Sequence, residues 1–195
     1  MLLALLATPA VAGTDHPMSP RPRLVVRGYP QTDLQPRDLD VIRDVVTRAF
    51  EDAIDVTWQV CGARRERAWT DTCDRPLGSA DIALRFIDDR VGERPEVLGI
   101  AAEGNGHRGV MATVFVNRVK AVASRTGLKF AQLAGRVSAH EMVHLLLGAG
   151  SHRGVGLMRP DWSEEQLHGR PEEWRISVEQ RRALVEAVRR RAETD

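Results

Sequence analysis

The chain has 195 residues, of which 43% are hydrophobic and 28% are charged, and its formal net charge at pH 7 is +1. These values are typical of one soluble globular domain, which is long enough to bury a hydrophobic core without internal repeats or a structural metal ion. A net charge so close to zero argues against a dedicated binder of nucleic acid or of another polyanion. We therefore expect a single domain over residues 23–195, because no internal repeat or domain linker is evident.

The first twelve residues resemble a secretory signal peptide. Leu2–Ala7 is a short apolar run, and Ala10-Val11-Ala12 forms a small-x-small cleavage site. The usual basic segment is missing, so a disordered apolar N-terminus is the alternative. The run is too short to span a membrane, and no other stretch approaches the length required. We expect a secreted or periplasmic protein whose residues 13–22, rich in proline and polar side chains, are flexible.

The first half of the chain predicts strands and one helix. A strand is expected at Leu24–Tyr29. An amphipathic helix is expected at Pro36–Ala53, because its apolar residues recur at helical spacing. Further strands are expected where short apolar or β-branched runs occur, at residues 56–60, 80–87, 98–102 and 110–116.

Two cysteines, Cys61 and Cys73, lie between the second and third expected strands. An even, small number of cysteines in an exported chain predicts one disulfide. It would close a short polar loop and stabilise the fold by about 3 kcal/mol in the chain-entropy account. Two free thiols in a reducing compartment are the alternative. A cysteine zinc site is disfavoured, because no CxxC spacing is present.

The second half of the chain predicts helices. A helix follows the last strand through Ala123, and a longer one spans Leu128–Leu147, with Gly135 as a tolerated weak point. The run Gly148-Ala149-Gly150 supplies the stop that such a helix needs. Ser163 begins a capping-box pattern, which predicts a further helix start.

A second capping box, Ser177-Val178-Glu179-Gln180, predicts a C-terminal helix. Its inward side is expected to carry the apolar residues Leu184, Val185 and Val188. Its arginines at positions 181, 182 and 189–191 are expected to form a solvated face rather than a binding patch.

The long helix contains the pattern HExxH at His140-Glu141-Met142-Val143-His144. Two histidines four positions apart lie on nearly the same helix face and can share one metal ion, for which neutral imidazole is a good ligand. Glu141 can then reach a water activated by the metal, as a general base. The motif is short and also occurs by accident. Here its neighbours are apolar, and burying these three side chains among them is costly unless a zinc ion satisfies them.

A third ligand is expected after the helix. His152 follows a glycine break, so the chain can turn back and bring it towards the pair. Glu164 or Glu165, from a downstream helix, are alternatives, although acidic residues in a first turn also favour the helix dipole. His107 and His168 lie in polar segments and are expected at the surface. Three histidines would leave a fourth position for water, which is typical of a catalytic rather than a structural zinc site.

These residues resemble the metzincin clan of zinc endopeptidases, whose pattern is HExxHxxGxxH followed by a methionine turn. Here the glycine stands one position later and the third histidine two positions later. The whole run HEMVHLLLGAGSHRGVGLM is similar to a group of exported bacterial metzincin-like proteins of unassigned substrate. The resemblance implies one zinc ion, Glu141 as catalytic base, Met158 as the turn methionine, and the metal ligands His140, His144 and His152.

The resemblance also implies an α+β fold in which a twisted mixed β-sheet packs on the active-site helix, with a C-terminal helix. Its implied activity is that of a zinc metalloendopeptidase acting on a peptide or protein substrate. Such a substrate lies extended along an edge strand, for which residues 110–116 are our candidate. Met158, Trp162 and Trp174 can also be read as ordinary packing residues.

Two other functions stay open at this point. One is an exported, non-catalytic binding domain that keeps zinc for stability, although such a site has no need of Glu141. The other is a zinc amidase acting on cell-wall peptide, which the sequence does not separate from a peptidase because specificity depends on pocket shape.

Overall fold

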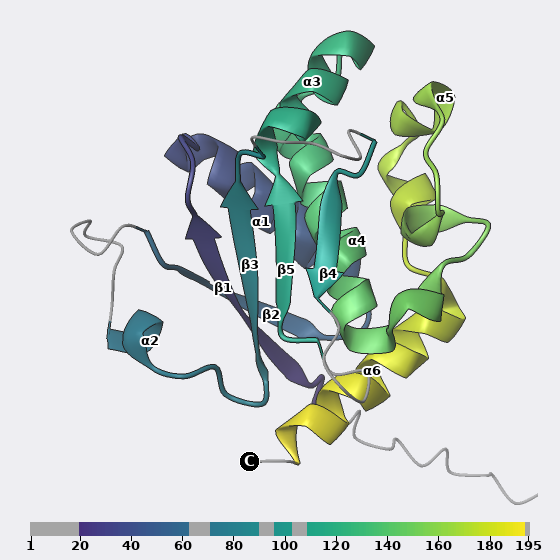
Figure 1. The fold of residues 1–195 in the computed structure, drawn as a ribbon. Helices are drawn as coiled ribbons and strands as arrows, with labels where there is room; N and C mark the ends of the chain where they lie inside the picture. Colours follow the sequence, from purple (N-terminus) through teal and green to yellow (C-terminus); the bar gives the residue numbers. More distant parts are fainter. Residues whose placement is uncertain (1–19, 63–70, 90–95, 103–108, 194–195) are drawn as a thin grey trace, which may run out of the picture.

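The computed structural model describes residues 20–62, 71–89, 96–102 and 109–193, and Figure 1 shows how their elements are arranged. The strands are β1 (Arg23–Pro30), β2 (Asp55–Val60), β3 (Asp81–Ile87), β4 (Gly99–Ala102) and β5 (Met111–Phe115). The α-helices are α1 (Pro36–Phe50), α2 (Asp71–Asp74), α3 (Val116–Thr126), α4 (Phe130–Leu147), α5 (Glu164–Leu167) and α6 (Val178–Ala192). Short 3-10 helices are η1 (Ala149–Ser151), η2 (Gly156–Met158) and η3 (Pro171–Trp174).

The expected elements are present with shifted ends. The first helix ends at Phe50 rather than at Ala53, and the long helix begins at Phe130 rather than at Leu128. The expected signal peptide at residues 1–12, residues 13–19 of the expected flexible segment, and His107 lie outside the described residues. Among the helices that are described, none combines the length and the apolar character that a membrane crossing requires.

The strands form one mixed sheet in the order β2-β1-β3-β5-β4. All neighbours are parallel except β4 and β5, which are antiparallel. The prediction that residues 110–116 form a substrate-binding edge strand is therefore wrong. Both sides of β5 are paired, to β3 and to β4, and among the described strands the edge on this side of the sheet is Gly99–Ala102. Apolar runs indicate that a strand exists, but they do not indicate its neighbours.

Helix α4 packs closely on α1, and both lie behind the sheet in Figure 1. A Cβ added at Gly135 would lie 2.6 Å from Cβ of Val45 and 3.3 Å from the carbonyl oxygen of Ile42. Gly135, which the sequence suggested would only weaken α4, thus lies where α1 and α4 approach closely, and a larger residue would not fit without a shift. Most of α4 is buried, from Ala131 to Leu146. This burial is why α4 carries apolar residues on all its faces.

The core joins the sheet to α4 and to the turn that follows it. Side chains that are less than 2% exposed come from all these parts, and the largest include Leu24, Ile42, Phe50, Ile82, Phe86, Leu133, Met142, Leu145, Leu157 and Met158. Burying one such side chain stabilises the fold by about 1.5–3 kcal/mol. The mixed sheet on a long helix, with the C-terminal helix α6, confirms the predicted fold class.

Two buried arginines tie loops to this core. Arg27 of β1 is 3% exposed, pairs with Asp81, and donates to the carbonyls of Thr72, Arg75 and Pro76. These acceptors lie next to Cys73, which a disulfide joins to Cys61. Buried charges need such partners.

Arg191 of α6 is the second of these arginines, and it corrects the expectation of a fully solvated arginine face. Its side chain is 6% exposed and donates to the carbonyls of Ser79, Asp81 and Gly109. The C-terminal helix is thereby fastened to the residues around the start of β3 and just before β5.

Candidate metal centre

Three histidine side chains converge at the end of α4. His140 and His144 are separated by one helical turn, and their Nε2 atoms are 3.0 Å apart. The 3-10 turn Ala149–Ser151 then reverses the chain, so that Nε2 of His152 lies 3.1 Å from that of His144 and 3.3 Å from that of His140. The structure therefore brings together the three histidines that the sequence predicts as ligands, and they can hold a metal ion.

The spacing of these nitrogens is compatible with ligands of a tetrahedral zinc ion. Ligands at about 2.0–2.1 Å from a tetrahedral zinc lie about 3.3–3.4 Å from one another. The observed separations are 3.0, 3.1 and 3.3 Å, so small side-chain movements suffice. Three ring nitrogens that face one another at this distance repel unless a proton or a cation lies between them. Imidazole nitrogen is also a ligand type that zinc prefers.

Backbone and hydroxyl groups orient the two helical histidines. Nδ1 of His140 lies 2.9 Å from the carbonyl oxygen of Leu157, which only accepts, so Nδ1 donates and Nε2 presents its lone pair to the cluster. Nδ1 of His144 lies 3.0 Å from Oγ of Ser151 and 3.3 Å from the carbonyl oxygen of Gly148. Burial is the main cause that lowers the pKa of His140 to about 4, with smaller contributions from the other two histidines. His140 is therefore neutral, as a ligand must be.

Glu141 lies beside the cluster under the edge strand. It is 8% exposed, and a Cβ added at Gly99 of β4 would lie 2.7 Å from its Cγ. Burial raises the pKa of Glu141 to about 7, and a hydrogen bond from the backbone of Ala101 opposes this effect. A carboxyl group whose pKa lies near neutrality can both accept and release a proton.

Met158 ends the 3-10 turn Gly156–Met158, which contacts His140. It is fully buried, and its neighbour Leu157 supplies the carbonyl that orients His140. The amide of Arg153 donates to the carbonyl of Met158 at 2.7 Å and closes the turn. Gly156 adopts a φ of 70°, and a Cβ there would lie 2.3 Å from the carbonyl oxygen of Arg175. The turn thus requires a glycine two residues before Met158.

Trp162 contributes to the site in a way that the sequence pattern does not reveal. Its ring meets that of His140 edge-on, with centroids 5.4 Å apart. The ring of Trp174 meets that of Trp162 edge-on, with centroids 4.9 Å apart, and the guanidinium of Arg136 lies 4.0 Å from the centroid of Trp174. Both tryptophans do pack, as expected, but Trp162 also lines the cleft over the histidines.

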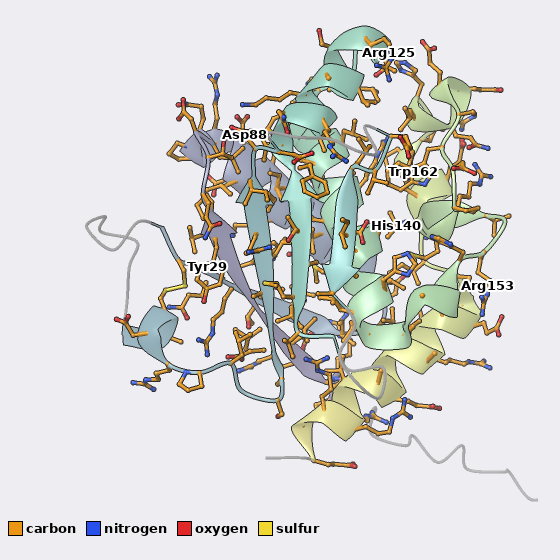
Figure 2. The ribbon with its side chains drawn as sticks, in the orientation of Figure 1. Tyr29, Asp88, Arg125, His140, Arg153 and Trp162 are labelled. Atoms are coloured by element: carbon orange, nitrogen blue, oxygen red, sulfur yellow. A yellow bond between two sulfur atoms is a disulfide. The ribbon has the colours of Figure 1, made fainter. Side chains whose placement is uncertain are left out.

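A cleft of about 1270 Å³ opens over the histidines. Figure 2 labels His140 and Trp162 on the side of the molecule where β4 faces the segment around α5. One wall is β4 with the residues before it, and another is the exposed side of α3. The segment from Arg159 to Trp162, together with Glu164 and Leu167 of α5, forms the remaining wall, and the floor includes His140, Glu141, His144 and His152.

The alternative ligands lie outside the cluster of three histidines, although Glu164 lines the same cleft. Glu164 and Glu165 occupy the first turn of α5, which Ser163 caps together with Gln166, and both are exposed. Within the described part of the chain, the group able to hold a metal ion contains only the three histidines. His168 is exposed, and its Nε2 lies 2.9 Å from the carbonyl oxygen of Thr126. The structure therefore favours His152 over either glutamate as the third ligand.

Comparison of the sequence with protein-family models and with curated proteins gives no match. The fold is similar to that of metalloproteinase-II from Bacteroides fragilis, with a TM-score of 0.56 and 16% identity over 89% of this chain and 56% of that chain. It is also similar to that of archaemetzincin from Methanopyrus kandleri, with a TM-score of 0.55 and 16% identity over 88% of this chain and 96% of that chain. The chain thus spans little more than half the length of the first protein, and at this identity the likeness shows a common fold.

Proposed function

We propose that the protein is a zinc-dependent metallopeptidase of the metzincin type. The observation that carries the proposal is the convergence of three histidine Nε2 atoms, at 3.0–3.3 Å, beside a buried glutamate in an open cleft. The two similar folds are those of proteins named metalloproteinase and archaemetzincin, which supports the same reaction class.

His140, His144 and His152 would hold one zinc ion. When bound, zinc would lower the pKa of a water molecule towards about 7 and polarise a substrate carbonyl. Three protein ligands leave the fourth position open to the cleft, which suits catalysis better than a closed structural site. The neutral state of His140 and the orientation of its ring by Leu157 favour metal binding at Nε2.

Glu141 would be the general base. Its carboxylate would take the proton of the attacking water and then give it to the leaving amine, so that one group serves both halves of the reaction. Its pKa of about 7 is suited to both steps. A zinc site that served only stability would not need this carboxylate, whose burial among apolar side chains is costly.

The substrate would lie along β4. An extended peptide can pair its main chain with the free edge of Gly99–Ala102, which forms one wall of the cleft directly above α4. Ile100 of this strand is 51% exposed and would contact the substrate. Met158 would support the ligands from below through the turn that contains Leu157.

We also propose that the protein is exported and that residues 1–12 are its signal peptide. The disulfide between Cys61 and Cys73 supports this location, because such bonds persist in oxidising compartments.

Activity would be tested with purified wild type and with Glu141→Gln. The control is Glu165→Gln, which makes the same substitution at an exposed glutamate of α5. Each protein, with its zinc content measured, is incubated with a diverse peptide mixture and with cell-wall peptides, and products are read by mass spectrometry. We expect wild type and Glu165→Gln to cleave ordinary peptides and Glu141→Gln to be inactive with zinc bound. Cleavage of cell-wall peptides alone would show an amidase. Zinc-loaded, folded wild type that cleaves nothing would favour a non-catalytic binding domain.

A further inference from the structure

We propose that Ser151 and Gln180 form a positioning link that holds two of the metal ligands, His144 and His152, from the C-terminal helix. The inference rests on the proposed zinc site and adds two residues to it, neither of which contacts the metal or the substrate. Both residues are almost completely buried, Ser151 at 4% and Gln180 at 2% exposed.

The first contact of the link is made by the side chain of Ser151. Its Oγ lies 3.0 Å from Nδ1 of His144. When Nε2 of His144 faces a metal, Nδ1 carries the ring proton and donates it, and the hydroxyl oxygen accepts. The carbonyl of Gly148, at 3.3 Å, is a longer second acceptor for the same proton. The hydroxyl therefore sets the rotation of the His144 ring.

The second contact is made by the backbone of Ser151. Nε2 of Gln180 donates to the carbonyl of Ser151 at 2.7 Å. Because a carbonyl only accepts, the orientation of the amide is determined, and its Oε1 accepts from the hydroxyl of Ser177 at 3.2 Å. Ser177 also caps α6 by accepting from the amide of Gln180. Figure 1 shows α6 passing beside the end of α4, where this contact is made.

The link acts on two ligands because Ser151 directly precedes His152. Its side chain orients His144, while its carbonyl, held by Gln180, fixes the backbone from which His152 reaches the cluster. His144 and His152 are 8 positions apart, and the chain between them includes the 3-10 turn Ala149–Ser151. Within this spacing, Ser151 places its hydroxyl against His144 and its carbonyl against Gln180 of α6.

Three variants test the link. Ser151→Ala removes the hydroxyl, and Gln180→Met keeps the length and the apolar contacts of the side chain without its donor. Gln166→Glu is the control, because glutamate serves equally well in the capping box of α5. For each, the zinc Kd is measured by competition with a chromophoric chelator, and the Tm is measured with and without zinc.

We expect Ser151→Ala and Gln180→Met each to raise the zinc Kd about 10–100-fold, as loss of an outer partner of a ligand typically does. Their double variant should show less than the sum of the two effects in free energy, because both act through one turn. If Gln180→Met does not fold, Gln180→Glu, which sets a carboxylate against the Ser151 carbonyl, should raise the Kd likewise.

A purely structural role predicts a different pattern: the Tm of the metal-free variants falls while their zinc Kd stays within twofold of wild type. That result would overturn the link and leave the proposed zinc site intact. Wild type that binds no zinc would overturn the zinc site and the link together.

Discussion

Gly99 of the edge strand lies against Glu141 so closely that a Cβ there would stand 2.7 Å from Cγ and 2.9 Å from Oε1 of the carboxyl group. Real Cβ contacts do not approach this distance, so any other residue at position 99 must displace either β4 or Glu141. The same contact places β4, the strand proposed to bind the substrate, against the proposed base. The position of Glu141 thus depends on the absence of a side chain at Gly99 in β4.

Gly99→Ala is accordingly expected to lower kcat at least tenfold while zinc binding is retained. The atoms nearest to a Cβ at position 99 belong to Glu141 and Val137 rather than to the histidines, and Glu141 must move by a distance that matters for proton transfer. The measurement is steady-state kinetics together with zinc content. The matched control is Gly154→Ala, where a Cβ meets nothing within 4 Å. Unchanged kcat in Gly99→Ala would show that the exact position of Glu141 is unimportant.

Replacing the third histidine tests its assignment as a ligand. His152→Ala should raise the zinc Kd more than about 100-fold, because a direct bond to the metal is lost. Loss of a residue that only hydrogen-bonds to a ligand typically raises the Kd about 10–100-fold. His168→Ala is the control, since His168 bonds to Thr126 and lies outside the cluster. Equal zinc affinities of the two variants would exclude His152 and would reopen the case for a glutamate of α5.

The metal-free protein should show a pH dependence that belongs to Glu141. Folding raises the pKa of this group from 4.5 to about 7, so its contribution to stability is complete below pH 4.5 and is lost as the pH rises through 7. The shift corresponds to about 3 kcal/mol. We expect the free energy of unfolding of wild type minus that of Glu141→Gln to fall by this amount between pH 4 and pH 8 in urea titrations.

The pKa of His140, which burial lowers, acts in the opposite direction: its contribution is present above pH 6.5 and is lost as the pH falls towards 4. It is common to both proteins and cancels in the difference. A difference that does not change with pH would mean that the carboxyl group of Glu141 is well solvated.

Gly135→Ala should destabilise the fold. Alanine favours a helix over glycine by up to about 1 kcal/mol, but a methyl group 2.6 Å from Val45 overpacks the contact between α1 and α4, which typically costs about 1–3 kcal/mol. The Tm is therefore expected to fall by several degrees. Gly78→Ala, where the nearest atom is 3.8 Å away, is the comparison. A higher Tm in Gly135→Ala would show that the helices separate easily.

The parts of the site that were predictable follow from local geometry. His140 and His144 meet because a helix places residues four apart on one face, which any HExxH sequence guarantees once the helix forms. His152 was predicted from a pattern whose spacing differs by two residues, and in the structure it reaches the cluster after the 3-10 turn Ala149–Ser151.

The remaining features depend on pairings between distant segments. The sequence pattern of Gly99–Ala102 does not reveal that β4 lies at the edge of the described sheet. The pattern of β5 likewise does not reveal that this strand lies inside the sheet. Likewise, Arg191 lies in a run of arginines, and only the path of α6 past Gly109 buries it. The sequence predicts only a packing role for Trp162, and its contact with His140 is apparent only in the structure.

Anomalous diffraction at the zinc edge, from crystals of the protein purified with zinc, tests the central claim most directly. The account predicts one strong peak within about 2.0–2.1 Å of Nε2 of His140, His144 and His152, with a fourth position open to the cleft. A peak coordinated by Glu164 or Glu165 in place of His152, or no peak at the three histidines, would contradict it.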